Sequence, residues 1–391
     1  MSFYHKVEKI QSWRVILMAC AAFVFNTTEY VPIALLSDIA ESFSMTTAQT
    51  GLMVTVYAWT VLTMSLPGML LTGKMERRGL LIKLFLLFIA SHILSVIAWN
   101  YWILLLSRIG IALAHSIFWS ITASLVMRVA PKTKKTQALG MLAVGTALAT
   151  ILGLPLGRLI GQVVGWRVTF AIIGALALVI MLLLMRILPN IPSKNAGSLA
   201  SLPALAKRPL LLGIYGTVLI VIAAHFTAYT YIEPFMLQIG ELDPNFATAV
   251  LLIFGVSGLL ASLLFNRLYR LGPAKFIVSA VLLVGLSLAL LYFFVQNEIS
   301  MVAIALLWGT GISCIGLSMQ MRVLQLAPDA TDVATAIFSG IYNAGIGAGA
   351  LLGNQIMNHI GLQYVGFSGA IFALLALLLF LAVHYKYRVK A

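Results

Sequence analysis

The stretch WRVILMACAAFVFNTTEYVPIALL, from Trp13 to Leu36, is an apolar run that carries a glutamate, Glu29, toward its end. A helix needs about 20 mainly apolar residues to cross the hydrocarbon core of a bilayer, and this run is long enough. A charged side chain at that depth costs on the order of 2.5–3.5 kcal/mol, so it normally faces a partner or a cavity. The stretch therefore predicts a membrane-spanning helix with a functional carboxylate.

The rest of the chain repeats this apolar pattern. Of its 391 residues, 61% are hydrophobic and only 9% are charged, whereas about a quarter of the residues in soluble domains are charged. The pattern predicts an all-α integral membrane protein with twelve transmembrane helices. We expect these helices at about residues 13–36, 47–72, 80–98, 101–128, 135–160, 166–188, 209–237, 245–268, 274–296, 299–325, 332–357 and 362–385.

The net charge of +14 does not indicate a nucleic-acid-binding surface. Apart from Arg158 and Arg167, around the loop after the fifth run, nearly all of the Lys and Arg residues occur in short clusters at both termini and in every second loop between the apolar runs. Such loops of a membrane protein remain in the cytoplasm, so we expect both termini there and a multi-pass protein of the bacterial inner membrane.

A polar segment with several prolines separates the first six apolar runs from the last six. We expect an N-terminal six-helix half at residues 1–190, a cytoplasmic linker at 191–208 and a C-terminal six-helix half at 209–391. Gly157 and Gly353 close glycine-rich tracts in the fifth and eleventh runs, 196 positions apart. The halves therefore resemble internal repeats, which place a substrate site at their interface near the middle of the bilayer.

Three ionisable residues of the N-terminal half form a candidate proton-coupling group. A rise of about 1.5 Å per residue places Glu29 roughly 10 Å, and Arg108 roughly 9 Å, inside the outer membrane boundary. A direct pair would offset part of each burial cost; the alternative is that each snorkels or pairs elsewhere. His115 follows Arg108 by seven residues and shares its helical face, so it serves either a proton relay or a bond to a neighbouring helix. For His92, a purely structural bond is the favoured interpretation.

Polar and aromatic residues inside the apolar runs are candidates for substrate binding. Aromatic rings combined with amides suit hydroxylated ligands such as sugars, and suit amphiphilic drugs nearly as well. Part of the aromatic set also fits an interfacial belt. Pro234 predicts a break in its helix, with polar groups lining a cavity beside it. The candidates are Asn26, Thr28, Tyr57, Trp119, His225, Tyr229, Tyr231, Glu233 and Asn343.

The fifth run carries small residues at a spacing typical of close helix contact. Gly145, Gly153 and Gly157 flank Pro155, and small residues about four apart let two helices approach closely. The same spacing fits either static packing or sliding between two packed states.

Several long stretches resemble a known family. They include FNTTEYVPIALLSDIA (25–40), SRIGIALAHSIFWSITASL (107–125), LGLPLGRLIGQVVGWR (152–167) and AHFTAYTYIEPF (224–235). On these stretches the chain resembles, over essentially its whole length, the twelve-helix major facilitator superfamily. More closely, it resembles the bacterial sugar efflux transporters of the SotB type, in the drug:proton antiporter branch.

The resemblance implies roles for particular residues. Arg108 matches a basic motif implicated in proton transfer. The glycines of the fifth run, with Pro155, resemble a motif associated with export, although Leu154 interrupts it. The loop GKMERRGLL (73–81) resembles a degenerate form of the family's gate loop, in which Glu76 would stand for an aspartate and Arg77 and Arg78 would be its gate partners.

The resemblance implies an exporter that exchanges protons for sugars or sugar-like solutes by alternating access. The alternative is a multidrug:proton antiporter of lipophilic compounds, and a remote alternative is a membrane-embedded transferase. The sequence contains no paired carboxylates, metal-spaced His/Cys cluster or nucleophile elbow, so we expect no enzyme, no metal and no cofactor besides the coupling proton. The expected partners are a small-molecule substrate and membrane lipid, without nucleic acid, and we expect a monomer.

Overall fold

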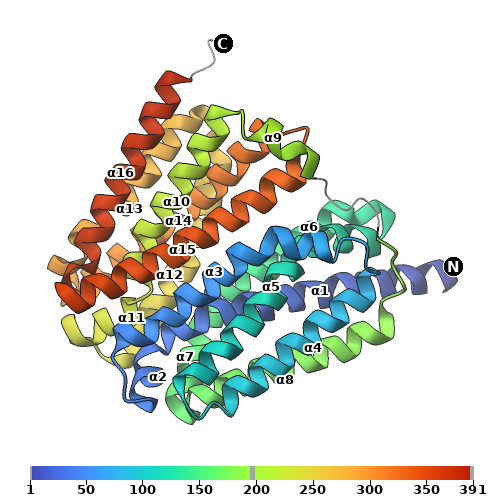
Figure 1. Cartoon of the computed structure of the whole chain (residues 1–391), viewed down its shortest axis with the longest axis horizontal. Coiled ribbons are helices and arrows are strands. Elements are labelled where there is room, and N and C mark those ends of the chain that lie inside the picture. The colour runs from blue at the N-terminus through green and yellow to red at the C-terminus, as the bar shows by residue number, and fades with distance from the viewer. Residues whose placement is uncertain (1, 194–198, 388–391) are drawn as a thin grey trace. The chain divides into compact units, whose positions relative to one another are not determined.

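The computed structural model describes residues 2–193 and 199–387, which form helices joined by short connections, with no strand among them (Figure 1). The α-helices are α1 (Ser2–Ala34), α2 (Leu36–Ser42), α3 (Thr47–Leu71), α4 (Arg77–Val96), α5 (Tyr101–Val129), α6 (Lys135–Leu148), α7 (Leu154–Val164), α8 (Trp166–Ile187), α9 (Leu202–Leu205), α10 (Pro209–Tyr229), α11 (Ile232–Pro234), α12 (Pro244–Leu268), α13 (Pro273–Phe294), α14 (Glu298–Leu326), α15 (Thr331–His359) and α16 (Val365–Lys386). Short 3₁₀ or π segments are η1 (Lys132–Lys134), η2 (Ala149–Gly153), η3 (Leu199–Ser201), η4 (Phe235–Ile239), η5 (Tyr269–Leu271) and η6 (Leu362–Tyr364).

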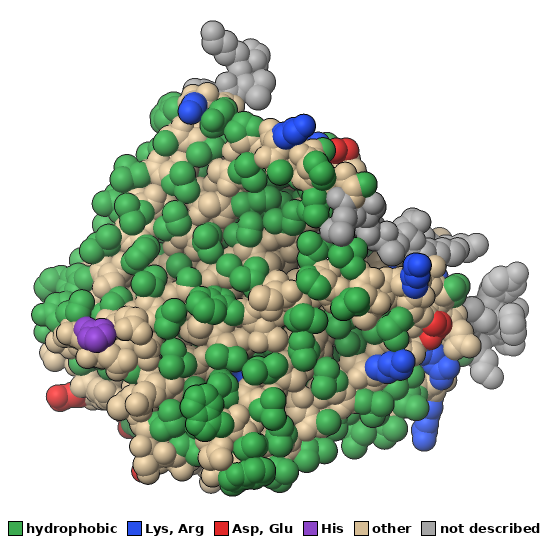
Figure 2. All heavy atoms as spheres, in the orientation of Figure 1, with side chains coloured by type: hydrophobic (Ala, Val, Ile, Leu, Met, Phe, Trp, Pro, Cys, Tyr) green, Lys and Arg blue, Asp and Glu red, His purple; other side chains and the backbone are tan. Residues whose placement is uncertain are grey.

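The described residues contain twelve helical segments that are long and apolar enough to cross a membrane, which confirms the predicted fold class. Their bounds lie close to the expected runs, although α1 begins at Ser2, well before Trp13. Many large apolar side chains on these helices are exposed, and hydrophobic side chains are spread across the face drawn in Figure 2. Such a surface suits lipid rather than water.

The chain separates into two compact units. Unit 1 consists of Met1–Leu35 and Thr63–Gly197, and unit 2 of Leu36–Leu62 and Ser198–Ala391. The expected division into six-helix halves at residues 191–208 stays a prediction, and residues 194–198 of that linker lie outside the described residues.

In unit 1, α1 packs against α5, α6, α7 and α8, while α4 packs against α5 and α8. The fifth span is interrupted by the π segment η2, which ends two residues before Pro155. Proline has no N–H to donate to the preceding helical turn, so a π segment there accommodates the missing hydrogen bond.

In unit 2, α10 packs against α15 and α16, and α13 packs against α14 and α16. Part of α3 also belongs to this unit, because Thr55 Oγ1 donates to the Gly347 carbonyl at 3.1 Å. The break expected near Pro234 is present: α10 ends at Tyr229, and the short α11 and η4 follow it.

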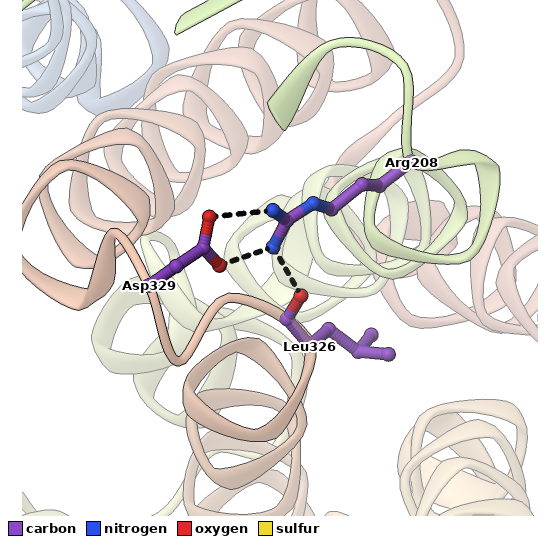
Figure 3. A network of polar contacts seen from close by, with 3 residues as sticks. All are labelled: Arg208, Leu326 and Asp329. Atoms are coloured by element: carbon purple, nitrogen blue, oxygen red, sulfur yellow. Dashed lines mark hydrogen bonds and ion pairs between the residues drawn. The ribbon is translucent and has the colours of Figure 1, made fainter. Parts of the chain in front are cut away.

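An ion pair fastens the start of α10 to the connection between α14 and α15. Arg208 Nη1 and Nη2 donate to the two carboxylate oxygens of Asp329 at 2.8 and 2.7 Å, and Nη1 also donates to the Leu326 carbonyl at 2.8 Å (Figure 3). These hydrogen bonds from Arg208 lower the pKa of Asp329. The pair is solvent-exposed, so its contribution to stability is small.

Candidate functional site

The carboxylate of Glu29 lies beside an imidazole in unit 1. His115 Nε2 is 3.7 Å from Glu29 Oε2, and the exposed fractions of the two side chains are 6% and 12%. This separation is slightly longer than a hydrogen bond and lies within ion-pair distance. The His115 ring also interacts with Trp119, at a centroid distance of 6.1 Å. The structure therefore brings Glu29, His115 and Trp119 together.

Arg108 approaches the same segment of α1 from α5. Its guanidinium is fully buried, and Nη1 donates to the Thr28 carbonyl at 2.8 Å. The positive charge of Arg108 also acts on the Glu29 carboxylate through space. The structure thus places Arg108 beside the residue that precedes Glu29, while a direct bond between Arg108 and Glu29 stays a prediction.

His92 on α4 completes this arrangement. Its Nδ1 lies 2.8 Å from the Phe88 carbonyl, and its Nε2 lies 2.9 Å from Thr28 Oγ1. A carbonyl can only accept, so Nδ1 carries a proton, and in the neutral imidazole Nε2 accepts the hydrogen bond of the Thr28 hydroxyl. Thr28 is therefore held by α4 through its side chain and by α5 through its carbonyl. A structural bond for His92 was the expected interpretation, but its attachment beside Glu29 was not anticipated.

A second cluster of aromatic rings forms in unit 2, around His225. The His225 ring stacks on Tyr229 at 4.7 Å and on Phe254 at 5.9 Å, and Trp308 meets it edge-on at 5.4 Å. Within the described part of the chain, His225 Nδ1 and Trp308 Nε1 are buried without a hydrogen-bond partner. A buried donor or acceptor in that state favours a ligand or water that can bond to it.

The sequence missed Phe254 and Trp308 as members of this cluster. Aromatic residues in apolar runs usually pack against lipid or other helices, so their types alone gave no signal. Their positions on α12 and α14 can only be linked to His225 once the helix packing is known.

Other predicted binding residues use their polar atoms within unit 2. Tyr231 donates its hydroxyl to the Ala350 carbonyl at 2.8 Å, and Glu233 accepts from Ser37 Oγ at 2.6 Å. Both contacts join helices. Asn343 donates from Nδ2 to Ser339 at 3.0 Å, while its buried Oδ1 has no hydrogen-bond partner among the described residues.

Two further predicted residues are buried on different units. Tyr57 lies on α3 in unit 2, and Asn26 lies on α1 in unit 1. Their roles in substrate binding stay predictions.

The glycines of the fifth span lie against α1. A Cβ added at Gly153 would come within 2.6 Å of Thr27 Oγ1, and one at Gly157 within 2.7 Å of a Val31 methyl group. An added Cβ at Gly145 would collide with the Ala19 carbonyl. The structure thus places these residues in a close helix contact, and a gating role stays a prediction.

Glu76 and Arg77 tie the loop before α4 to the segment after α8. The Glu76 carboxylate caps α4 by accepting from the Arg78 and Gly79 amides at 2.8 and 2.6 Å, and it also accepts from the Ile191 amide at 2.6 Å. Arg77 Nη2 donates to Ser193 Oγ at 3.0 Å. Burial opposes ionisation of Glu76, but these three amide donors and the Arg78 charge outweigh it and lower its pKa.

Comparison with known proteins assigns the family. Residues 18–333 match the Major Facilitator Superfamily. The chain belongs to this superfamily. A solved bacterial homologue of the human lysosomal transporter Spinster, in an inward-facing and unoccupied conformation, has a TM-score of 0.74 at 13% identity and covers 97% of this chain and 98% of its own. A solved transporter of the POT family, in complex with 5-aminolevulinic acid, has a TM-score of 0.79 at 11% identity, with 97% of both chains covered. At these identities the likeness shows the shared fold.

Curated relatives are far more similar in sequence. A Haemophilus influenzae protein named "Probable sugar efflux transporter" is 70% identical over 388 residues, which are 99% of this chain and 98% of that protein. Proteins of the same name from Pasteurella multocida and Helicobacter pylori are 63% and 57% identical, and the matches cover 98% and 97% of this chain. These relatives are named as transporters rather than enzymes.

Proposed function

We propose that this chain is a proton-coupled exporter of sugars or sugar-like solutes in the bacterial cytoplasmic membrane. The observation that carries the proposal is the 70% identity, over nearly the whole of both chains, to a protein named "Probable sugar efflux transporter". The aromatic cluster around His225 supports it, because aromatic rings with free polar atoms can hold a ring-shaped, hydroxylated solute.

The group in unit 1 supplies the proposed coupling chemistry. Glu29 would take up a proton when the site opens to the outside and release it to the cytoplasm. Arg108 would stabilise the charged carboxylate. His115 would report substrate contact to Glu29, because its ring lies near both Trp119 and the Glu29 carboxylate.

The test uses purified protein in proteoliposomes, with a panel of sugars and thiogalactosides and with or without an imposed pH gradient. Glu29→Gln keeps the size and a hydrogen-bonding group but cannot ionise. We expect it to bind solute and to lose the stimulation by the pH gradient. Glu41→Gln, at an exposed position on α2, is the control and should transport normally. Undiminished gradient-driven transport by Glu29→Gln would falsify the coupling role.

The alternative function, export of lipophilic drugs, is favoured by the same aromatic cluster, because flat aromatic compounds also stack on such rings. Competition separates the two proposals. A sugar exporter should lose sugar transport when unlabelled sugar is added, and retain it when a lipophilic cation is added. Inhibition by the cation alone would favour the drug antiporter.

A further inference from the structure

We propose that a groove on unit 2 binds one anionic phospholipid, with the phosphate at Lys275 and an acyl chain between α12, α13 and α14. The groove has a cavity volume of about 460 Å³ and is lined only by residues of these three helices and of the connection between α12 and α13. This site is separate from the proposed transport function and does not depend on it.

The side of the groove formed by α14 is chemically apolar, although two polar side chains lie in it. Thr310 donates its hydroxyl to the Leu306 carbonyl at 2.7 Å, and the Cys314 thiol lies 3.8 Å from the Ala261 carbonyl. Both polar groups thus point to backbone carbonyls, Thr310 to one on α14 itself and Cys314 to one on α12. A sugar would find few free donors or acceptors here, whereas a hydrocarbon chain needs none.

The end of the groove at the connection between α12 and α13, which we call its mouth, carries the cation Lys275. The Lys275 side chain lies over Gly272, because a Cβ added at Gly272 would be 3.7 Å from Lys275 Cβ and Cδ. The described residues offer Lys275 no ion-pair partner. Along one face of α13, Lys275 is followed after four residues by Ser279 and after eight by Leu283, all of which line the groove. This order, from charged to polar to apolar, matches an amphiphile that enters with its tail first.

The surroundings of the mouth add more positive charge. Arg267 lies in the last turn of α12 and Arg270 lies in η5. Both are exposed and have no carboxylate partner in the part of the chain that the structure describes. Leu268 and Leu271, which line the groove, are 45% and 82% exposed beside them. Exposed leucines among uncompensated cations are typical of the boundary between lipid tails and headgroups. Basic pockets between transmembrane helices suit anionic headgroups.

The experiment titrates delipidated, full-length protein in detergent with dioleoyl phosphatidylglycerol or dioleoyl phosphatidylcholine and counts bound lipids by native mass spectrometry. We expect the wild type to bind the first phosphatidylglycerol more tightly than phosphatidylcholine. The preference should be about fivefold for each Lys or Arg side chain that contacts the headgroup. Lys275→Gln should reduce that preference by about fivefold. Lys74→Gln, an exposed lysine of unit 1, is the matched control and should keep it. Equal affinity for the two lipids, or an unchanged preference in Lys275→Gln, overturns the proposal.

A second pair of variants tests the acyl chain. Ser279→Trp fills the groove and should lose the first bound lipid of either headgroup, while Leu286→Trp, at an exposed position on the same helix outside the groove, should retain it. Size-exclusion chromatography of each variant establishes that it is folded. Excess inorganic phosphate should not displace phosphatidylglycerol. Displacement by phosphate, or normal lipid binding by Ser279→Trp, overturns the assignment of the tail to this groove.

Discussion

Thr28 is the residue that fixes the backbone beside the candidate coupling carboxylate. Its carbonyl accepts from Arg108, and its hydroxyl donates to His92. Both contacts are fully or almost fully buried, where a lost hydrogen bond is not replaced by water. The backbone position of Glu29 therefore depends on the contacts that its neighbour Thr28 makes with α4 and α5.

Thr28→Val tests this dependence, because valine keeps the shape and removes the hydroxyl. The buried His92 Nε2 would lose its donor, so we expect the free energy of unfolding to fall by about 1–3 kcal/mol. The measurement is the melting temperature in detergent. The neighbouring Thr27→Val is the control: Thr27 Oγ1 is buried without a hydrogen-bond partner among the described residues, so its removal should leave stability unchanged or raise it. Equal losses in both variants would contradict a specific role for the His92 contact.

The charged members of the site could be predicted from sequence, but the bonds made by its neutral members could not. Glu29, Arg108 and His115 stand out because ionisable groups are costly in an apolar run. The Thr28–His92 bond joins residues 64 positions apart, and it depends on helix rotations that residue types do not specify. For the same reason the sequence placed Tyr231 and Glu233 among binding residues, without showing that their polar atoms bond to neighbouring helices.

Helix contacts repeat between the two units at a constant offset. Gly153 faces Thr27 on α1, and Gly349 faces Ala223 on α10; both members of the second pair lie 196 positions after those of the first. Gly157 with Val31, and Gly353 with Thr227, repeat at the same offset. The offset that the sequence showed for two glycines thus extends to the surfaces they pack against. The glycines are needed because the helices approach too closely for a side chain.

Gly349→Ala tests this contact in unit 2. The added methyl group would come within 2.5 Å of the Ala223 carbonyl oxygen, and backbone cannot move aside as a flexible side chain can. We expect a loss of about 1–3 kcal/mol in the free energy of unfolding, seen as a lower melting temperature. Gly316→Ala on α14 is the control, because nothing lies within 4 Å of its added Cβ. A Gly349→Ala variant as stable as Gly316→Ala would show that the two helices are not held at this distance.

The junction at the start of α4 should respond to pH. The pKa of Glu76 is lowered in the folded protein, so its stabilising effect is complete above the ordinary glutamate pKa of about 4.3 and is lost as the pH falls through the lowered value. We expect the protection of the Arg78, Gly79 and Ile191 amides against hydrogen exchange, relative to the intrinsic exchange rate at each pH, to fall across that range. Glu76→Gln, which cannot ionise, should show lower protection of these amides at neutral pH and no change in protection with this titration. Identical pH profiles in both proteins would contradict the role of the carboxylate.

At the scale of the whole molecule, hydropathy predicted all twelve spans because lipid imposes the same requirement on each of them. The interruptions within spans were harder to predict. Pro234 marked the break after α10, but Pro155 did not predict the π segment η2, since a proline can also be accommodated by a kink. The placement of Leu36–Leu62 in unit 2 was also not visible in the sequence, because it depends on contacts such as Asn354 Nδ2 with the Ala48 carbonyl at 2.6 Å.

The distribution of Lys and Arg makes a prediction about orientation that two single-cysteine variants can test. In a background with Cys20→Ser and Cys314→Ser, Trp99→Cys places a thiol in the basic-poor loop before α5, and Lys74→Cys places one in the basic loop before α4; both positions are exposed. Positive loops remain in the cytoplasm, so a membrane-impermeant maleimide should label Trp99→Cys in spheroplasts. It should label Lys74→Cys only after the membrane is opened. The reverse pattern would place the termini outside the cytoplasm and would contradict the orientation predicted from the basic loops.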